Sequence, residues 1–182
     1  MYKKGALLFA IVIAVFFLFS TKSYSQFELD RSYIGPTIGL SFLGSAPQFG
    51  VNYEYSLELQ NFGSVGIGGV FRYWGYSNNE FYGKLSYTNI LIGVQGNYHF
   101  KVTNDKWDPW IGLVLADDIA STSATYNDFY LNYSYSASVG GIFLGLQGGV
   151  RYWINPNLAI VARIGYGSLS YGALDVGVDF KL

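Results

Sequence analysis

Apolar and polar residues alternate at every second position over residues 173–182 of the chain. The apolar set is Leu174, Val176, Val178, Phe180 and Leu182, and the residues between them are Asp175, Gly177, Asp179 and Lys181. A period of two places the two sets on opposite faces of a β-strand. An unpaired strand with one apolar face invites aggregation, so we expect this strand to pair with the first strand of a closed sheet.

Earlier segments show the same alternation, and no amphipathic helix pattern appears after residue 26. The pattern predicts strands over 34–43, 48–59, 64–74, 89–100, 109–116, 139–153 and 158–166, in addition to 173–182. The strand over 109–116 is less regular, because Trp110 and Val114 fall on the face opposite Ile111 and Leu113. The chain is therefore predicted to be all-β.

The predicted connections alternate in length. Residues 60–63, 101–108 and 155–157 read as short to medium turns that carry Asn, Asp, Gly or Pro. Residues 75–88 and 117–138 read as longer loops. Ten strand residues at ~3.3 Å each, tilted by about 40°, rise about 25 Å, which is the height of the apolar band of a membrane-spanning barrel.

Composition supports a surface that faces lipid. Hydrophobic residues make up 51% of the 182-residue chain and charged residues only 13%, whereas a soluble surface usually carries roughly 25–35% charge. Aromatic residues reach 19% and Gly counts 23, which is typical of a β-barrel with aromatic belts and small interior residues. The absence of Cys excludes a disulfide scaffold and cysteine-based metal or lipidation sites. A net charge of −1 gives no sign of the basic surface that binds nucleic acid. No cofactor is expected.

Residues 1–25 read as a secretory signal peptide. Lys3 and Lys4 form a basic start, and residues 6–19 are almost wholly apolar, which is shorter than a membrane-spanning helix of ~20 residues. Ser23 and Ser25 occupy the two positions that a signal peptidase inspects, so cleavage is predicted before Gln26. The alternative is an uncleaved membrane anchor.

The C-terminal pattern Asp175-x-Gly177-x-x-Phe180-x-Leu182 resembles the assembly signal of bacterial outer-membrane barrels, although many of these end in Phe. Gly177, Phe180 and Leu182 carry the resemblance. Together with the strand pattern, the mature chain resembles the small eight-stranded outer-membrane barrels, namely the OmpA-type transmembrane domain and its OmpX-like relatives. The resemblance implies an eight-stranded antiparallel up-and-down transmembrane β-barrel over residues 26–182, in the bacterial outer membrane with both termini periplasmic.

The same resemblance implies the partners. Outer-membrane lipids and lipopolysaccharide would surround the barrel, and the barrel-assembly machinery would act during insertion. The chain is expected to be a monomer. Its long connections could bind an extracellular ligand. The barrel pattern occupies the sequence up to Leu182, so we do not expect the peptidoglycan-anchoring role of full-length OmpA-type proteins.

Charged residues on the polar strand faces point into the centre of such a barrel, which is just wide enough to be filled by side chains. Because charges removed from water need partners, we predict an interior network of Glu54, Arg72, Arg151, Arg163 and Asp175. The alternative is that these residues pack independently with trapped water. A network that fills the lumen predicts that the barrel does not conduct freely.

His99 is the only histidine. Some eight-stranded barrels that resemble this one modify lipid A with a His–Ser site near the outer surface. With both termini periplasmic, the fourth predicted strand runs from the outer surface toward the periplasm. His99 is therefore expected at the periplasmic end, away from outer-leaflet lipid A. No serine motif accompanies it. We therefore expect a structural histidine and no enzyme activity.

The aromatic residues are expected to gather at both membrane interfaces, where amphipathic rings prefer to lie. The periplasmic set is Tyr98, Phe100, Trp107, Trp110, Tyr152 and Phe180, and the outer set is Tyr73, Trp74, Tyr76, Tyr87, Tyr166 and Tyr171. Residues 126–135 form either a surface recognition loop or a hairpin that extends its two strands beyond the membrane. The aromatic residues of this segment are Tyr126, Phe129, Tyr130, Tyr133 and Tyr135.

These observations favour an integral outer-membrane barrel with a structural or surface-interaction role. The alternatives are a lipid A-modifying barrel enzyme and a narrow pore for small solutes. A secreted soluble barrel is disfavoured, because its outer face would be rich in Lys and Glu, whereas this polar face is rich in Gly, Asn and Gln.

Overall fold

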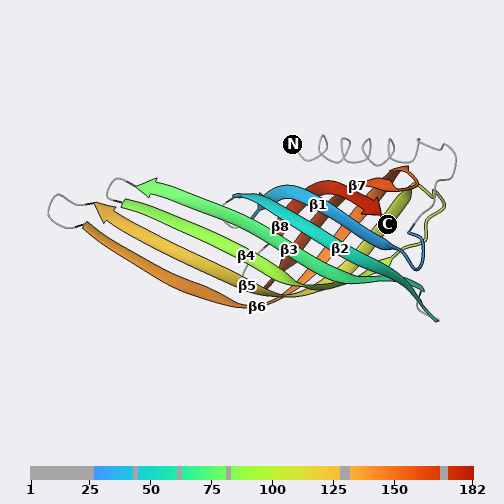
Figure 1. Ribbon diagram of the computed structural model, residues 1–182, viewed down its shortest axis with the longest axis horizontal. Coiled ribbons are helices and arrows are strands. Elements are labelled where there is room, and N and C mark those ends of the chain that lie inside the picture. Colours follow the sequence, from blue (N-terminus) through green and yellow to red (C-terminus); the bar gives the residue numbers. More distant parts are fainter. Residues whose placement is uncertain (1–26, 43–44, 61–62, 81–82, 128–131, 169–171) are drawn as a thin grey trace, which may run out of the picture.

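The computed structural model describes residues 27–42, 45–60, 63–80, 83–127, 132–168 and 172–182. Its strands form one closed antiparallel barrel in which each strand pairs with its neighbours in sequence order and β1 pairs with β8 (Figure 1). The strands are β1 Ser32–Ser41, β2 Pro47–Leu59, β3 Gly63–Glu80, β4 Gly83–His99, β5 Trp107–Asn127, β6 Asn132–Asn155, β7 Leu158–Gly167 and β8 Gly172–Lys181. The predicted fold and the closure of the last strand onto the first are confirmed.

The apolar strand faces point outward. Ile38 on β1 lies opposite Val176 on β8, and their side chains are 53% and 51% exposed. Asp175 and Asp179, on the other face of β8, are 3% and 2% exposed. The outer surface of β1 and β8 is therefore apolar, and the two carboxylates of β8 are buried within the barrel.

Four strands are longer than predicted. β3 and β4 pair as far as Glu80 opposite Gly83, and β5 and β6 pair as far as Asn127 opposite Asn132. The expectation of loops over 75–88 and 117–138 was therefore wrong, and the hairpin alternative for 126–135 agrees with the structure. The missed segments alternate Ser, Thr, Asn and Tyr, so they lack the apolar face on which the strand prediction depended.

The extra length of β3 to β6 forms a sheet that projects from one end of the barrel (Figure 1). We call this part, residues 75–80, 83–88, 117–127 and 132–144, the projecting sheet. β1, β2, β7 and β8 do not continue beside it, since they end or begin at Ser41, Pro47, Gly167 and Gly172.

Buried apolar clusters lie toward the two ends of the lumen. The cluster at the end of the lumen from which the projecting sheet extends contains Ala46, Val70, Trp74, Leu91, Val114, Ala116, Phe143 and Ala173. The cluster at the opposite end contains Phe27, Tyr33, Trp153 and Ala159. Side chains therefore fill both ends of the lumen, as is usual in a barrel of eight strands.

Two tryptophans do not lie in the predicted interfacial belts. Trp74 is 1% exposed, because it shares the inward face of β3 with Arg72. Trp110 is 5% exposed, because it shares the inward face of β5 with Val114. The expectation for these two was wrong, since strand alternation decides the direction of a side chain before its amphipathic character does. Phe100, Phe180, Tyr73, Tyr76, Tyr87 and Tyr166 are exposed on the outside, as expected, and Tyr171 lies outside the described residues.

The predicted signal peptide and its cleavage site before Gln26 also lie outside the described residues. No helix in the described ranges is long and apolar enough to cross a membrane.

Candidate functional site

The structure places the five predicted interior residues on the inner face of the barrel. Glu54, Arg72, Arg151, Arg163 and Asp175 are all between 1% and 6% exposed. They come from β2, β3, β6, β7 and β8 and meet across the lumen in two separate groups. We call these groups the Arg151 cluster and the Arg72–Arg163 cluster.

The Arg151 cluster lies toward the end of the barrel opposite the projecting sheet. Arg151 donates from Nε to Asp179 Oδ2 at 2.5 Å, from Nη1 to Asp108 Oδ2 at 3.2 Å, and from Nη2 to Glu54 Oε2. One guanidinium thus holds carboxylates from β8, β5 and β2. Its planar, forked set of donors suits this bridging role better than a lysine ammonium would.

His99 completes the Arg151 cluster. Its Nδ1 lies 2.6 Å from Asp108 Oδ1, and its Nε2 lies 2.9 Å from Glu54 Oε1. The imidazole ring stacks on Phe27, with ring centroids 3.6 Å apart. His99 is 3% exposed at the end of β4, so it lies in the lumen, as expected.

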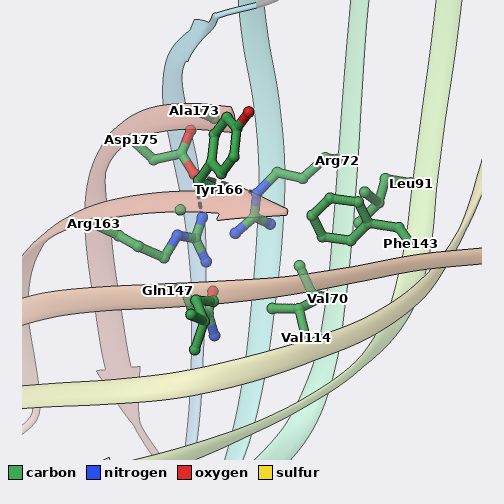
Figure 2. Close-up of a pocket in the computed structure, with 12 residues that line it drawn as sticks. Val70, Arg72, Leu91, Val114, Phe143, Gln147, Arg163, Tyr166, Ala173 and Asp175 are labelled. Carbon is green, nitrogen blue, oxygen red and sulfur yellow. Dashed lines mark hydrogen bonds and ion pairs between the residues drawn. The ribbon is translucent and has the colours of Figure 1, made fainter. Parts of the chain in front are cut away.

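The Arg72–Arg163 cluster lies nearer the projecting sheet. Asp175 pairs with both arginines, with Arg72 Nε 3.3 Å from Asp175 Oδ2, and Figure 2 shows the three side chains together. Arg72 Nη2 and Arg163 Nη1 each donate to Asn52 Oδ1 at 2.6 Å. Gln48 Nε2 donates to Asp175 Oδ1 at 2.7 Å.

A chain of buried amides extends the Arg151 cluster across the lumen. Gln147 Nε2 donates to Gln95 Oε1 and to Asn97 Oδ1, both at 2.9 Å, and Asn97 Nδ2 donates to Glu54 Oε1 at 3.0 Å. Buried polar groups are thereby paired with one another rather than with bulk water.

The charges of the two clusters are unevenly distributed. Both ring nitrogens of His99 face carboxylate oxygens, and only a doubly protonated ring donates both bonds. The Arg151 cluster sets Arg151 and His99 against the three carboxylates of Glu54, Asp108 and Asp179, which outnumber the cations in either protonation state of the His99 ring. The Arg72–Arg163 cluster holds two cations against one carboxylate. The first group therefore has an excess of negative charge and the second an excess of positive charge.

Sequence reasoning did not include Asp108, His99 and Asp179 in the network. The predicted strand began at Pro109, so Asp108 fell in a turn, whereas β5 begins at Trp107. Asp179 carried a usable signal, because it shares the inward parity of Asp175 on β8. Within the described residues, no group of acidic or histidine side chains has an arrangement that would hold a metal ion.

Gly66 provides the space in which the Glu54 carboxylate lies. A Cβ at Gly66 would overlap the Glu54 side chain, including its carboxylate carbon. We expect Gly66→Ala to lower the free energy of unfolding by about 1–3 kcal/mol, because overpacking displaces a buried carboxylate from Arg151 and His99. Urea unfolding in lipid vesicles, followed by tryptophan fluorescence, measures the change.

Gly96 provides the matched control for Gly66. It lies on the neighbouring strand opposite Ile67, and a Cβ there would meet no atom within 4 Å. Gly96→Ala should leave stability unchanged or slightly raised. An equal loss in both variants would show that Gly66 is not reserved for the Glu54 side chain.

The other predicted site residues belong to β8 and the C-terminal residue beside it, and to the tip of the projecting sheet. Phe180 and Leu182, of the proposed assembly signal, are 45% and 67% exposed, and Gly177 lies opposite Thr37 on β1. Tyr133 and Tyr135 are exposed on β6, and Tyr126 belongs to β5 opposite Tyr133. Phe129 and Tyr130 lie outside the described residues.

No protein-family model and no curated protein matches the chain. Solved structures do match. A major outer membrane protein from Thermus thermophilus has a TM-score of 0.64 at 12% identity, covering 84% of this chain and 98% of that one. Ail of Yersinia pestis, in complex with the heparin analogue sucrose octasulfate, has a TM-score of 0.54 at 16% identity, covering 84% and 97%. The N-terminal β-barrel domain of Pseudomonas aeruginosa OprF has a TM-score of 0.52 at 13% identity, covering 85% and 98%.

At these identities the likeness concerns the fold. It agrees with the apolar outer surface and with the outer-membrane location predicted from the sequence. The chain is therefore a closed eight-stranded β-barrel with the fold of the small outer-membrane barrels.

Proposed function

We propose that the chain is a non-enzymatic integral outer-membrane protein that holds a rigid sheet outside the membrane for contact with another protein. The projecting sheet carries this proposal, since β3 to β6 continue well beyond the ends of the other strands. Outer-membrane lipids and lipopolysaccharide would contact the apolar outer band. The barrel-assembly machinery would act on β8 and its C-terminal residues during insertion.

The free edge of β6 supports an interaction role. β7 pairs with β6 only from Gly145 onward, and Ser168 Oγ bonds the backbone of Leu144 and Ile142, so the free edge covers described residues 132–141, which have a partner strand on the β5 side alone. Residues 131–150 contain no Lys, Arg, Asp, Glu or Pro, which are the residues that usually protect an edge strand. An extended segment of another protein can add to such an edge through main-chain hydrogen bonds.

The charge of the projecting sheet favours a polypeptide over an anionic glycan. Ail is described in complex with a heparin analogue. In the projecting sheet, Lys84 is the one basic residue among those described, and the acidic residues are Glu80, Asp117 and Asp118. Exposed Tyr133 and Tyr135 add aromatic contact area next to the free edge.

The lumen supports a role without conduction or catalysis. Buried side chains occupy it from Tyr33 and Trp153 at one end to Trp74 at the other. His99, which a hydrolytic site would need, is held between Glu54 and Asp108. We expect planar-bilayer recordings to show no steady open channel, and a large stable conductance would contradict a filled lumen.

Single cysteines test the orientation on intact cells, since the chain has no native Cys. We expect Ser136→Cys, exposed on the projecting sheet, to react with a membrane-impermeant maleimide from outside. Asn157→Cys, exposed in the β6–β7 turn, should react only after the outer membrane is permeabilised. The reverse labelling pattern would place the projecting sheet in the periplasm and overturn the proposal.

Photo-crosslinking tests the free edge itself. A photoreactive amino acid at Ser136, on β6, should form adducts with a protein partner when cells that carry the barrel in their outer membrane are irradiated. The same amino acid at Ser86, on β4 between two paired strands, is the control, because its edges are occupied by β3 and β5. Equal adduct yields at both positions, or none at either, would contradict strand addition at β6.

A further inference from the structure

A cavity of about 40 Å³ lies inside the barrel beside the Arg72–Arg163 cluster. Figure 2 shows Arg163 and Asp175 on one side of it, Val70, Leu91, Val114 and Phe143 on the other, and Arg72 between them. We call the charged side of the cavity, with Arg72, Arg163 and Asp175, its floor. We call the apolar side, with Val70, Leu91, Val114 and Phe143, its wall. It is independent of the surface role proposed above.

The size of the cavity exceeds that of a single water site. A buried water needs about 10–15 Å³ on this measure, so 40 Å³ accommodates a group of a few heavy atoms. The lining continues to Leu146 and Tyr166, which are 62% and 61% exposed on the outside of the barrel. The cavity therefore extends as far as the β6–β7 pair.

The charge at the floor favours an anion. The side chains of Arg72, Arg163 and Asp175 are 4%, 6% and 4% exposed, so two guanidinium groups share one carboxylate away from bulk water. Electrostatic interactions are stronger in such surroundings than in water. A guanidinium is also weakly hydrated and matches a carboxylate in shape, so a carboxylate is the anion that suits this pair of arginines best.

The wall favours an apolar group attached to that anion. Val70, Leu91, Val114, Phe143 and Ala173 present hydrocarbon to the cavity. We infer that the cavity is a binding site for a small monocarboxylate, with its carboxylate against Arg72 and Arg163 and its short alkyl chain against Val70, Leu91 and Val114. An inorganic anion would satisfy the floor but gain nothing from the wall.

Gly165 lines the cavity and offers a way to fill it. A Cβ at Gly165 would lie 3.5 Å from Leu146 O and 3.6 Å from Gln147 Cβ, which is ordinary contact. A Cβ at Gly165 therefore fits beside the backbone, and we expect the methyl groups of Gly165→Val to occupy the cavity. Gly148→Val is the matched control, because Gly148 pairs with Ile164 one strand away, and a Cβ there would meet only Trp110 O at 3.6 Å.

Methyl NMR of the complete barrel in nanodiscs tests the inference with sodium butanoate as the probe. We expect saturable shifts at the methyl groups of Val70, Leu91 and Val114, and none at the lipid-facing methyls of Val94 and Leu113. Butanamide, which has the same shape and no charge, should not produce them. Acetate should bind more weakly, by no more than about 15-fold for two lost methylene contacts.

The variants localise the effect. Gly165→Val should abolish the saturable shifts, and Gly148→Val should retain them, with folding of both checked by heat-modifiable gel mobility. Equal shifts from butanamide, equal affinity for chloride, or unchanged butanoate binding in Gly165→Val would each overturn the inference. The comparison of butanoate with butanamide uses the unaltered chain, so it decides the question even if a variant does not fold.

Discussion

Arg151→Gln is expected to lower the free energy of unfolding of the barrel by about 3–5 kcal/mol. Arg151 holds Glu54, Asp108 and Asp179, and its side chain is 4% exposed. Removing one partner of a buried ionic group leaves the others buried without compensation, which costs more than the pair contributes to stability. The guanidinium also lies over the rings of Phe27 and Tyr33, at 5.7 and 5.3 Å from their centroids, so packing is lost as well.

Urea unfolding in lipid vesicles measures this loss, with Arg31→Gln as the control. Arg31 makes an ion pair with Glu28 at 3.6 Å, but its side chain is 55% exposed, and exposed pairs contribute roughly 0–1 kcal/mol. A double-mutant cycle with Glu54→Gln should give a coupling of about 0.5–3 kcal/mol between the two buried residues. Equal, small losses for Arg151→Gln and Arg31→Gln would show that the Arg151 cluster does not hold the lumen together.

Val94→Arg is expected to lower the free energy of unfolding by about 2–4 kcal/mol, which is the usual cost of arginine on the lipid face at the centre of the bilayer. Val94 lies opposite Leu115 on β5 and Gly69 on β3, and its side chain is 59% exposed. A substitution this exposed would be nearly neutral in a soluble protein. The loss would therefore arise from lipid and not from packing.

Ser123→Arg is the control for Val94→Arg. Ser123 is exposed on β5 within the projecting sheet, beyond the apolar band. Its replacement should change stability by less than about 0.5 kcal/mol. Measured in the same vesicles, a neutral Val94→Arg would contradict contact between this face and lipid.

Strand parity was sufficient to predict much of the lumen. Each residue of a strand alternates between the two faces, so Glu54, Arg72 and Asp175 were assigned to the interior before any partner was known. The same rule would have assigned Trp74 to the interior, where it lies at 1% exposure. The error arose from giving the preference of tryptophan for interfaces more weight than its position in the strand.

The pairing within the lumen could not be predicted from the sequence. Arg151 and Glu54 are 97 residues apart and meet only because the closed barrel brings β6 across from β2. The contact of His99 with Asp108 depends on the register that sets His99 opposite Trp110. The projecting sheet was missed for a different reason, since strands outside the membrane need no apolar face.

Nitroxide accessibility along β8 tests the central claim that the apolar strand face meets lipid. Single cysteines at Leu174, Val176 and Phe180 carry the spin label in vesicles, and Ser136→Cys carries it on the projecting sheet. We expect Val176 to collide with oxygen more often than with a water-soluble nickel chelate, and Ser136 to show the opposite preference. Frequent collision of the labels at Leu174 and Val176 with the nickel chelate would contradict contact between this face and lipid. Shielding of both labels from both reagents, within a water-soluble body, would contradict it as well.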